Sequence, residues 1–133
     1  MALTEGMTTT RTFQVDRDRT IDFMGEECRV YATPSLIRDI EHTCRDFIVE
    51  NVDAGMDSVG VTVNVTHMAP TLMGMEAEIT VTVSKAEGPK VSFDIAARDG
   101  LETICKGSHD RFVVDVEKTA QRLAAKAAKA KGE

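Results

Sequence analysis

Apolar residues recur at steps of three and four positions from Pro34 to about Glu50, which predicts one amphipathic helix. Thr33 and Pro34 form a strong start signal, with threonine as the N-cap and proline at the first helical position. The apolar stripe of this helix consists of Leu36, Ile37, Ile40, Cys44, Phe47 and Ile48. The charged residues assigned to its solvated face are Arg38, Asp39, Arg45 and Asp46.

Outside this helix the pattern alternates with a period of two, which indicates β-strands. A first strand is expected within residues 11–19 and an irregular segment over 20–31. Four further strands are expected near 59–68, 75–84, 91–97 and 101–116, the last with a bend near Gly107. In the first of these four, alternation assigns one face to Val59, Val61, Val63, Val65 and His67.

Short turns join the last four strands, so they should form an antiparallel meander. One apolar helix stripe and one apolar sheet face must bury each other. The expected fold class is therefore α+β, with a central helix wrapped by a curved antiparallel sheet, as in the hot-dog fold. Residues 1–118 are expected to form one domain. Residues 119–133 are expected to form an Ala/Lys-rich tail that is helical or frayed.

Two ionisable groups point to the predicted interior. Glu41 falls within the apolar helix stripe, and His67 continues the valine face of a strand. Thr33 adds a hydroxyl at the helix N-terminus, where free N–H groups favour negative charge. Together these groups could hydrolyse an activated acyl group. Each also has a plainer interpretation: Glu41 reaches water, His67 is a satisfied core histidine, and Thr33 is only an N-cap.

Thr33 and Glu41 are separated by eight positions, or about 12 Å along one helix. They cannot touch directly within one regular helix, so either His67 bridges toward them or a second chain contributes one member. An exposed sheet edge favours pairing with another copy, and a homodimer is expected. His42 and His109 compete for the histidine role. His42 falls toward the solvated side, whereas His109 is either structural or part of the site lining.

Composition narrows the class of protein. The chain has 133 residues, of which 42% are hydrophobic and 29% charged, as is typical of a globular domain. The net charge of −6 disfavours nonspecific nucleic-acid binding. Neither a membrane span nor a signal peptide is expected. Three widely spaced cysteines without a CxxC pair indicate neither a disulfide framework nor a metal site, and favour the cytoplasm.

Four stretches of the chain resemble the fluoroacetyl-CoA thioesterase group of hot-dog thioesterases. They are residues 30–33, Glu41, residues 60–67 and residues 107–111, and the similarity extends from about Val30 to Lys118. The resemblance implies Thr33, Glu41 and His67 as catalytic residues. It implies Gly60 as a substrate-binding residue whose backbone lies near the thioester carbonyl. It also implies a dimer and an acyl-CoA substrate, with CoA as part of the substrate and no separate cofactor.

The resemblance is weaker in the segment Thr20–Tyr31. This segment is short, and Phe23 is the sole phenylalanine within it. A general short-chain or otherwise unknown acyl-CoA is therefore expected in preference to a fluorinated one. Thioester hydrolysis is the leading interpretation, with two alternatives. One is a hot-dog enoyl-CoA hydratase or dehydratase, which also pairs a histidine with an acidic residue. The other is a non-catalytic acyl-CoA binding protein.

Overall fold

The computed structural model describes residues 3–132 and contains five strands and two α-helices in that range. The strands are β1 (Thr8–Gln14), β2 (Met56–His67), β3 (Glu76–Glu87), β4 (Lys90–Arg98) and β5 (Thr103–Asp115). The helices are α1 (Thr33–Val49) and α2 (Val116–Ala130), and two short 3₁₀ turns cover Arg17–Arg19 and Glu26–Cys28. Within the described range, no helix is long and apolar enough to cross a membrane.

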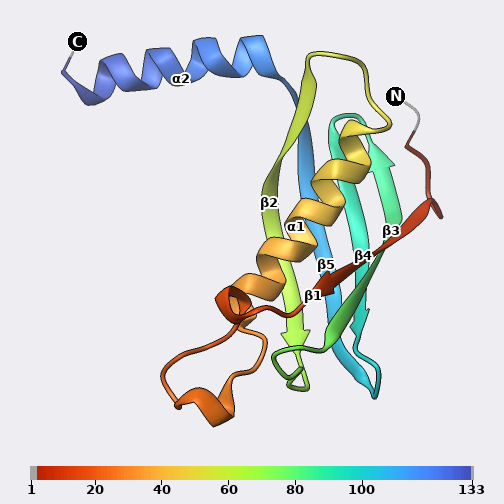
Figure 1. Cartoon of the computed structure of the whole chain (residues 1–133). Coiled ribbons are helices and arrows are strands. Elements are labelled where there is room, and N and C mark those ends of the chain that lie inside the picture. Colours follow the sequence, from red (N-terminus) through yellow and green to blue (C-terminus); the bar gives the residue numbers. More distant parts are fainter. Residues whose placement is uncertain (1–2, 133) are drawn as a thin grey trace.

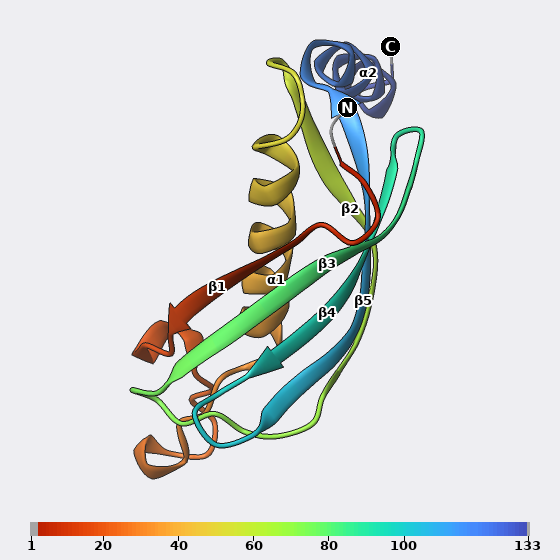
Figure 2. The ribbon, with the colours of Figure 1, turned by 90° about the vertical axis from the view of Figure 1, so that its right-hand side faces the viewer.

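The five strands form one sheet in the order β1-β3-β4-β5-β2, and every neighbouring pair is antiparallel. The sheet curves around one side of α1, as Figures 1 and 2 show. This arrangement confirms the expected hot-dog fold. The first strand was misplaced, because β1 ends at Gln14 and not at residue 19. The side chain of Asp16 accepts a hydrogen bond from the Arg19 amide and starts a 3₁₀ turn there.

The core lies between α1 and the concave face of the sheet. The buried helix stripe contains Leu36, Ile40, Cys44 and Ile48, each with no exposed surface. The alternating residues predicted for β3 and β4 meet this stripe; they are Ala77, Ile79, Val81 and Val83 on β3 and Val91, Phe93, Ile95 and Ala97 on β4. The predicted periods therefore identified both faces of the core.

The alternation predicted for β2 was wrong in part, because a bulge interrupts its pairing with β5. The register shifts between Gly60 and Thr62, which leaves Val61 without a partner. Val59 pairs with the exposed Phe112 on one side of this bulge, whereas Val63 pairs with the buried His109 on the other. One extra residue reverses the facing of the side chains. Gly60, which precedes the bulge, and His67, which follows it, therefore both face α1.

Helix α1 has a different N-cap from the one predicted, and α2 is a regular helix where a helical or frayed tail was expected. The N-cap of α1 is Ala32, so Thr33 is the first helical residue and makes no capping hydrogen bond. Its hydroxyl is consequently available for another contact. The C-terminal segment forms a regular helix, α2, capped by the Asp115 side chain at the Lys118 amide. In Figure 1, α2 projects from the end of β5 beyond the edge of β2.

Candidate active site

Thr33 and His67 meet where the N-terminus of α1 lies beside the end of β2. The Thr33 hydroxyl and His67 Nδ1 are 2.8 Å apart and share a hydrogen bond. Tyr31 also lies near the histidine, with the two rings edge to face and their centroids 6.4 Å apart. The Nε2 atom of His67 is buried and has no hydrogen-bond partner among residues 3–132. A buried polar atom of this kind is costly unless water or a ligand hydrogen-bonds to it, so Nε2 is a candidate contact for the substrate or for the attacking water.

The environment of His67 favours its neutral form. Burial lowers the pKa of His67 below its usual value of 6.5, while the backbone of Ala69 acts in the opposite direction. A neutral imidazole at neutral pH can accept a proton, as a general base must. The hydrogen bond to Thr33 orients the ring. The pair therefore has both the protonation state and the fixed geometry that acid–base chemistry needs.

A cavity of about 330 Å³ opens beside this pair. Its lining is mostly apolar; it comprises Ile21, Phe23, Val30, Tyr31, Thr33, His67, Met68, Ala69 and Pro70. An apolar hollow with a few convergent polar groups is the usual form of a small-molecule site. Four of these residues belong to the segment between β1 and α1, which Figures 1 and 2 show beyond the N-terminal end of α1.

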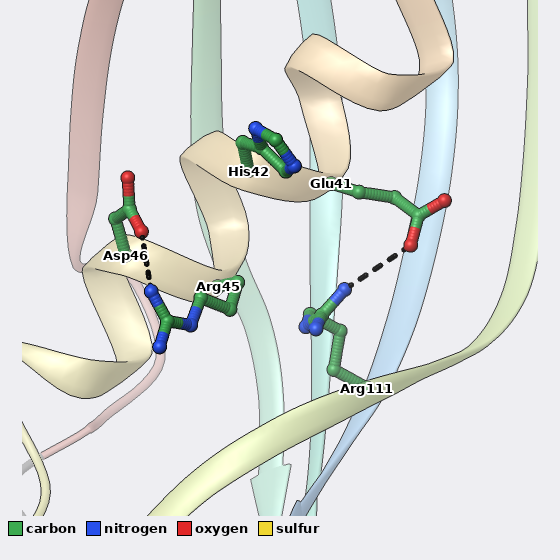
Figure 3. A pocket seen from close by; sticks show the side chains of 5 residues that line it. All are labelled: Glu41, His42, Arg45, Asp46 and Arg111. Carbon is green, nitrogen blue, oxygen red and sulfur yellow. Dashed lines mark hydrogen bonds and ion pairs between the residues drawn. The ribbon is translucent and has the colours of Figure 1, made fainter. Parts of the chain in front are cut away.

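Glu41 lies in a second group, further along α1. Its side chain is 40% exposed, so it sits at the edge of the apolar stripe and not within the core. Its Oε2 atom is 3.4 Å from Nη1 of Arg111 on β5. Figure 3 shows the two side chains pointing toward each other, while Arg45 pairs with Asp46 on the same helix. A cavity of about 380 Å³ adjoins this group.

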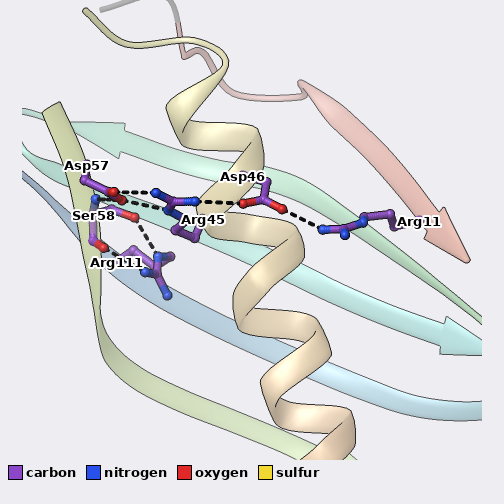
Figure 4. A network of polar contacts seen from close by, with 6 residues as sticks. All are labelled: Arg11, Arg45, Asp46, Asp57, Ser58 and Arg111. Carbon is purple, nitrogen blue, oxygen red and sulfur yellow. Dashed lines mark hydrogen bonds and ion pairs between the residues drawn. The ribbon is translucent and has the colours of Figure 1, made fainter. Parts of the chain in front are cut away.

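Arg111 is held firmly from the strand side. Its side chain is only 6% exposed, and its Nε donates to the Ser58 hydroxyl at 2.7 Å while Nη2 donates to the Ser58 carbonyl at 2.9 Å. Asp57, the neighbour of Ser58, accepts two hydrogen bonds from Arg45 at 2.9 and 2.6 Å. Figure 4 shows this chain of polar contacts continuing through Asp46 to Arg11. Arg111 therefore presents a fixed positive charge to Glu41.

His109 is a structural member of this second group. Its Nδ1 is 2.8 Å from the Thr62 carbonyl, and its Nε2 is 3.2 Å from Nη1 of Arg111. Because a carbonyl only accepts and a guanidinium only donates, Nδ1 carries the proton and Nε2 is the acceptor. Burial lowers the pKa of His109, which agrees with a neutral ring. Both nitrogens are thus engaged, and His67 is the better candidate for catalysis.

Gly60 allows the Glu41 carboxylate to approach β2. A Cβ atom at this position would lie 2.9 Å from Oε2 of Glu41 and 3.4 Å from Cε1 of His109. Any side chain there would displace one of these groups. The lack of a side chain at Gly60 therefore keeps space open between α1 and the edge strand.

The structure brings Thr33 and His67 together, and it brings Glu41 and Gly60 together, but the two groups remain apart. No hydrogen bond or ion pair within residues 3–132 joins Glu41 to Thr33 or His67. The separation follows from geometry, because Thr33 and Glu41 are about 12 Å apart along α1. His42 is exposed, as predicted from its position on the solvated side.

Two residues of the site region escaped the sequence analysis. Arg111 was noted within a motif without a role, although it alternates with His109 on one face of β5. Asp39 was assigned to the solvated face of the helix, but it is 3% exposed. It accepts hydrogen bonds from Arg19 and from the Tyr31 hydroxyl. Pairing with Arg19 and Tyr31 makes the burial of Asp39 possible. The helical period of the sequence contains no sign of these two partners.

Comparison with known proteins connects these features to a family. The family model for fluoroacetyl-CoA-specific thioesterases matches residues 15–117. A fluoroacetyl-CoA thioesterase from Streptantibioticus cattleyicolor is 32% identical over 89 residues. That alignment covers 67% of this chain and 64% of the relative, so the match spans less than two thirds of the relative's length.

Solved structures agree with this relationship. The fluoroacetyl-CoA thioesterase FlK has a TM-score of 0.85 and 27% identity, over 93% of this chain and 97% of FlK. A hypothetical protein from Thermus thermophilus, described as a thioesterase superfamily member, has a TM-score of 0.87 over 98% of this chain and 97% of its own. Its identity is 22%, so this similarity concerns the fold alone.

Proposed function

This chain belongs to the fluoroacetyl-CoA-specific thioesterase family, and we propose that it hydrolyses an acyl-CoA thioester to a carboxylate and free CoA. The observation that carries the proposal is the Thr33–His67 hydrogen bond at an apolar cavity. The hydroxyl, the imidazole and the hollow are the parts that an acyl-transfer site needs. The acyl group would occupy the hollow and place its carbonyl near these two side chains.

The proposed roles follow from the contacts of each residue. His67, neutral and oriented by Thr33, would activate water or orient the attacking group. Thr33 would position the thioester or its developing oxyanion, helped by the free N–H groups at the start of α1. Glu41, half exposed beside Arg111, would act as base, nucleophile or partner of the histidine. Gly60 would leave room for the thioester beside Glu41. No separate cofactor or metal is part of this proposal.

The proposed site is shared between two copies of the chain, which form a homodimer. Gly60 and His67 are seven positions apart on β2, on the order of 20 Å at strand spacing. That distance is too long for both to contact one thioester carbonyl within a single chain. Two β2 edges paired antiparallel about Val63 and Asn64 would place Gly60 of one copy opposite His67 of the other. The exposed Val61 and Val63 on this edge support such pairing.

Mixing two inactive variants tests the shared site. Glu41→Gln and His67→Ala homodimers should each be nearly inactive. After the chains are exchanged, half of the dimers should be mixed, and each mixed dimer should hold one intact site, giving about one quarter of the wild-type rate. A mixture that stays inactive while sedimentation shows mixed dimers would refute the shared site. A monomer at micromolar concentration would refute the dimer itself.

A screen of acyl-CoA esters with a thiol reagent tests hydrolysis directly. Release of free CoA with a short-chain ester supports the proposal. Loss of enoyl absorbance without thiol release would instead indicate the hydratase alternative. Tight binding of every ester without turnover would indicate a binding protein. A location in the cytoplasm is part of the same proposal and is supported by the three free cysteines.

A further inference from the structure

The segment between Arg19 and Ala32 forms a loop with a narrow neck. At the neck, Thr20 bridges Tyr31 as an antiparallel pair, and the Ala32 amide donates to the Arg19 carbonyl at 2.8 Å. Beyond the neck, the Ile21 amide donates to the Val30 carbonyl at 3.1 Å. The loop therefore leaves and re-enters the body of the protein through two adjacent chain segments.

Polar contacts also tie the tip of the loop to its neck and to the turn that precedes it. Glu26 accepts two hydrogen bonds from Arg17 at 2.7 Å and two from Arg29 at 3.0 Å. Arg29 additionally donates to the Thr20 hydroxyl at 3.0 Å. These contacts bind the tip to the neck. The returning segment is also fixed to residues 71–73, because the Tyr31 amide donates to the Thr71 carbonyl at 2.8 Å and the Met73 amide donates to the Arg29 carbonyl at 3.2 Å. These backbone bonds and the contacts at the neck together set the position of the loop beside the cavity.

Asp39 on α1 holds both segments of the neck. Its carboxylate accepts from Arg19 Nε at 2.8 Å and from Arg19 Nη2 at 3.3 Å, which fixes the outgoing segment. It also accepts a hydrogen bond from the Tyr31 hydroxyl, which fixes the returning segment. Asp39 and Tyr31 are both nearly inaccessible to solvent. Stability alone does not explain this arrangement, because a buried ion pair often stabilises no more than apolar residues of similar volume.

Tyr31 connects this arrangement to the proposed chemistry. Its ring lies edge-on to His67, and both residues line the cavity that contains Thr33. Three further lining residues, Ile21, Phe23 and Val30, belong to the same loop. A shift of the neck would therefore move the wall of the cavity as well as the support of the histidine ring.

We propose that Asp39 is a positioning residue for the acyl site. By holding Arg19 and Tyr31 together, it fixes the neck of the 20–31 loop against α1, and the loop so placed sets the size of the space beside His67. Asp39 touches no substrate; it acts through Tyr31 and the loop. This inference rests on the proposed thioesterase function, and it assigns selectivity for acyl length to the neck of the loop.

Two variants separate positioning from simple folding. Asp39→Asn removes the charge that holds both segments, and Tyr31→Phe removes only the returning link. Ile48→Val is the matched control, because it trims a fully buried residue at the far end of α1 without touching the loop. Rates are measured with one short and one longer straight-chain acyl-CoA. Thermal melts and amide exchange at Ile21 and Ala32 are measured on the same samples.

Asp39→Asn and Tyr31→Phe should each lose about tenfold or more in kcat for the short ester, because misplacement of a small group in a loosened site is costly. The longer ester should lose much less, since it fills the enlarged space, so the ratio of the two rates changes. KM should move less than kcat, and exchange at the two neck amides should accelerate. The Ile48→Val control should keep the wild-type ratio.

Equal losses for both esters in both variants, in proportion to the folded fraction, would overturn the proposal and leave Asp39 with a structural role. An unchanged ratio in a folded Tyr31→Phe variant would overturn it even if Asp39→Asn fails to fold. Absence of thiol release by the wild-type protein is a different result. It would refute the proposed function, while amide exchange at the neck would still report whether Asp39 holds the loop.

Discussion

Replacement of Glu41 by glutamine distinguishes a catalytic carboxylate from a structural ion pair. The substitution keeps the shape of the side chain and removes its charge. In the structure this carboxylate is 40% exposed and meets Arg111 through one long contact of 3.4 Å. Arg111 retains its hydrogen bonds to Ser58 and His109 whether or not Glu41 is charged.

The expected cost in stability is small for that reason. Removing one partner of a fully buried pair costs roughly 3–5 kcal/mol. A half-exposed pair contributes about 0–1 kcal/mol because solvent screens it. Glu41→Gln belongs near the half-exposed case, since Arg111 keeps most of its partners. A change of 1 kcal/mol corresponds to a shift in melting temperature of about 3–5 °C in a domain of this size. A catalytic base, in contrast, contributes about 10²–10⁴ in rate.

Steady-state rates and thermal melts on one purified variant provide the comparison. Asp46→Asn is the control, because Asp46 is also a carboxylate of α1, is 41% exposed and pairs with the exposed Arg11 and Arg45. We expect both variants to melt within a few degrees of the wild type, and only Glu41→Gln to lose most of its turnover. Wild-type turnover by a folded Glu41→Gln variant would refute the catalytic role. A melting shift several times larger than that of Asp46→Asn would indicate a structural pair instead.

Three other predictions concern the histidines and one glycine. His67→Ala should lower kcat by about 10²–10⁴ with little change in melting temperature. His109→Ala should lower the free energy of unfolding by about 1–3 kcal/mol in urea, because it leaves groups of Arg111 and Thr62 unpaired. Similar rate losses in both variants would contradict the assignment of catalysis to His67. Burial lowers the pKa of both histidines below 6.5, so at acidic pH the unfolded state binds more protons than the folded state, and stability should decline as pH falls below about 6.5. In contrast, kcat/KM should stay high until the lower pKa of His67 is reached. A rate that already falls above pH 6.5 would contradict the base role of His67. Gly107→Ala would place a Cβ atom 2.1 Å from the Asn64 carbonyl oxygen and should destabilise the fold by about 1–3 kcal/mol. Gly100→Ala is the control, because a Cβ atom there has no neighbouring atom within 4 Å. Equal urea midpoints for the two variants would refute this prediction.

The sequence predicted the elements with strong periodicity and missed the contacts between distant segments. The stripe of α1 and the alternation of β3 and β4 are visible locally, since burial of a regular face imposes a period. The bulge at Val61 is a property of the pairing between β2 and β5. A run of alternating valines contains no signal for it, and the facing of Val59 was therefore assigned wrongly.

Asp39 shows the same limit at the site. It follows Arg38 in the sequence, and its charge alone assigned it to solvent. Its actual environment depends on Arg19 and Tyr31, which the chain brings back from eight or more positions away. Thr33 was singled out as a helix start and His67 as the end of an alternating face, and the fold places their side chains 2.8 Å apart. Candidate residues could thus be found from the sequence, while the partners that fix their chemistry required the fold.

The positions of the two groups along the chain also favour a shared site over two separate ones. Thr33 with His67 has an apolar cavity and an unpaired nitrogen, but within residues 3–132 no carboxylate hydrogen-bonds to either side chain. Glu41 with Arg111 has a charged pair and open space at Gly60, but both nitrogens of His109, the histidine that contacts Arg111, are engaged. Each group lacks what the other contains. In the proposed dimer, antiparallel pairing of two β2 edges would bring the two groups together twice, once at each end of the interface. Such a dimer would account for one helix carrying both groups at a spacing that prevents their contact within a chain.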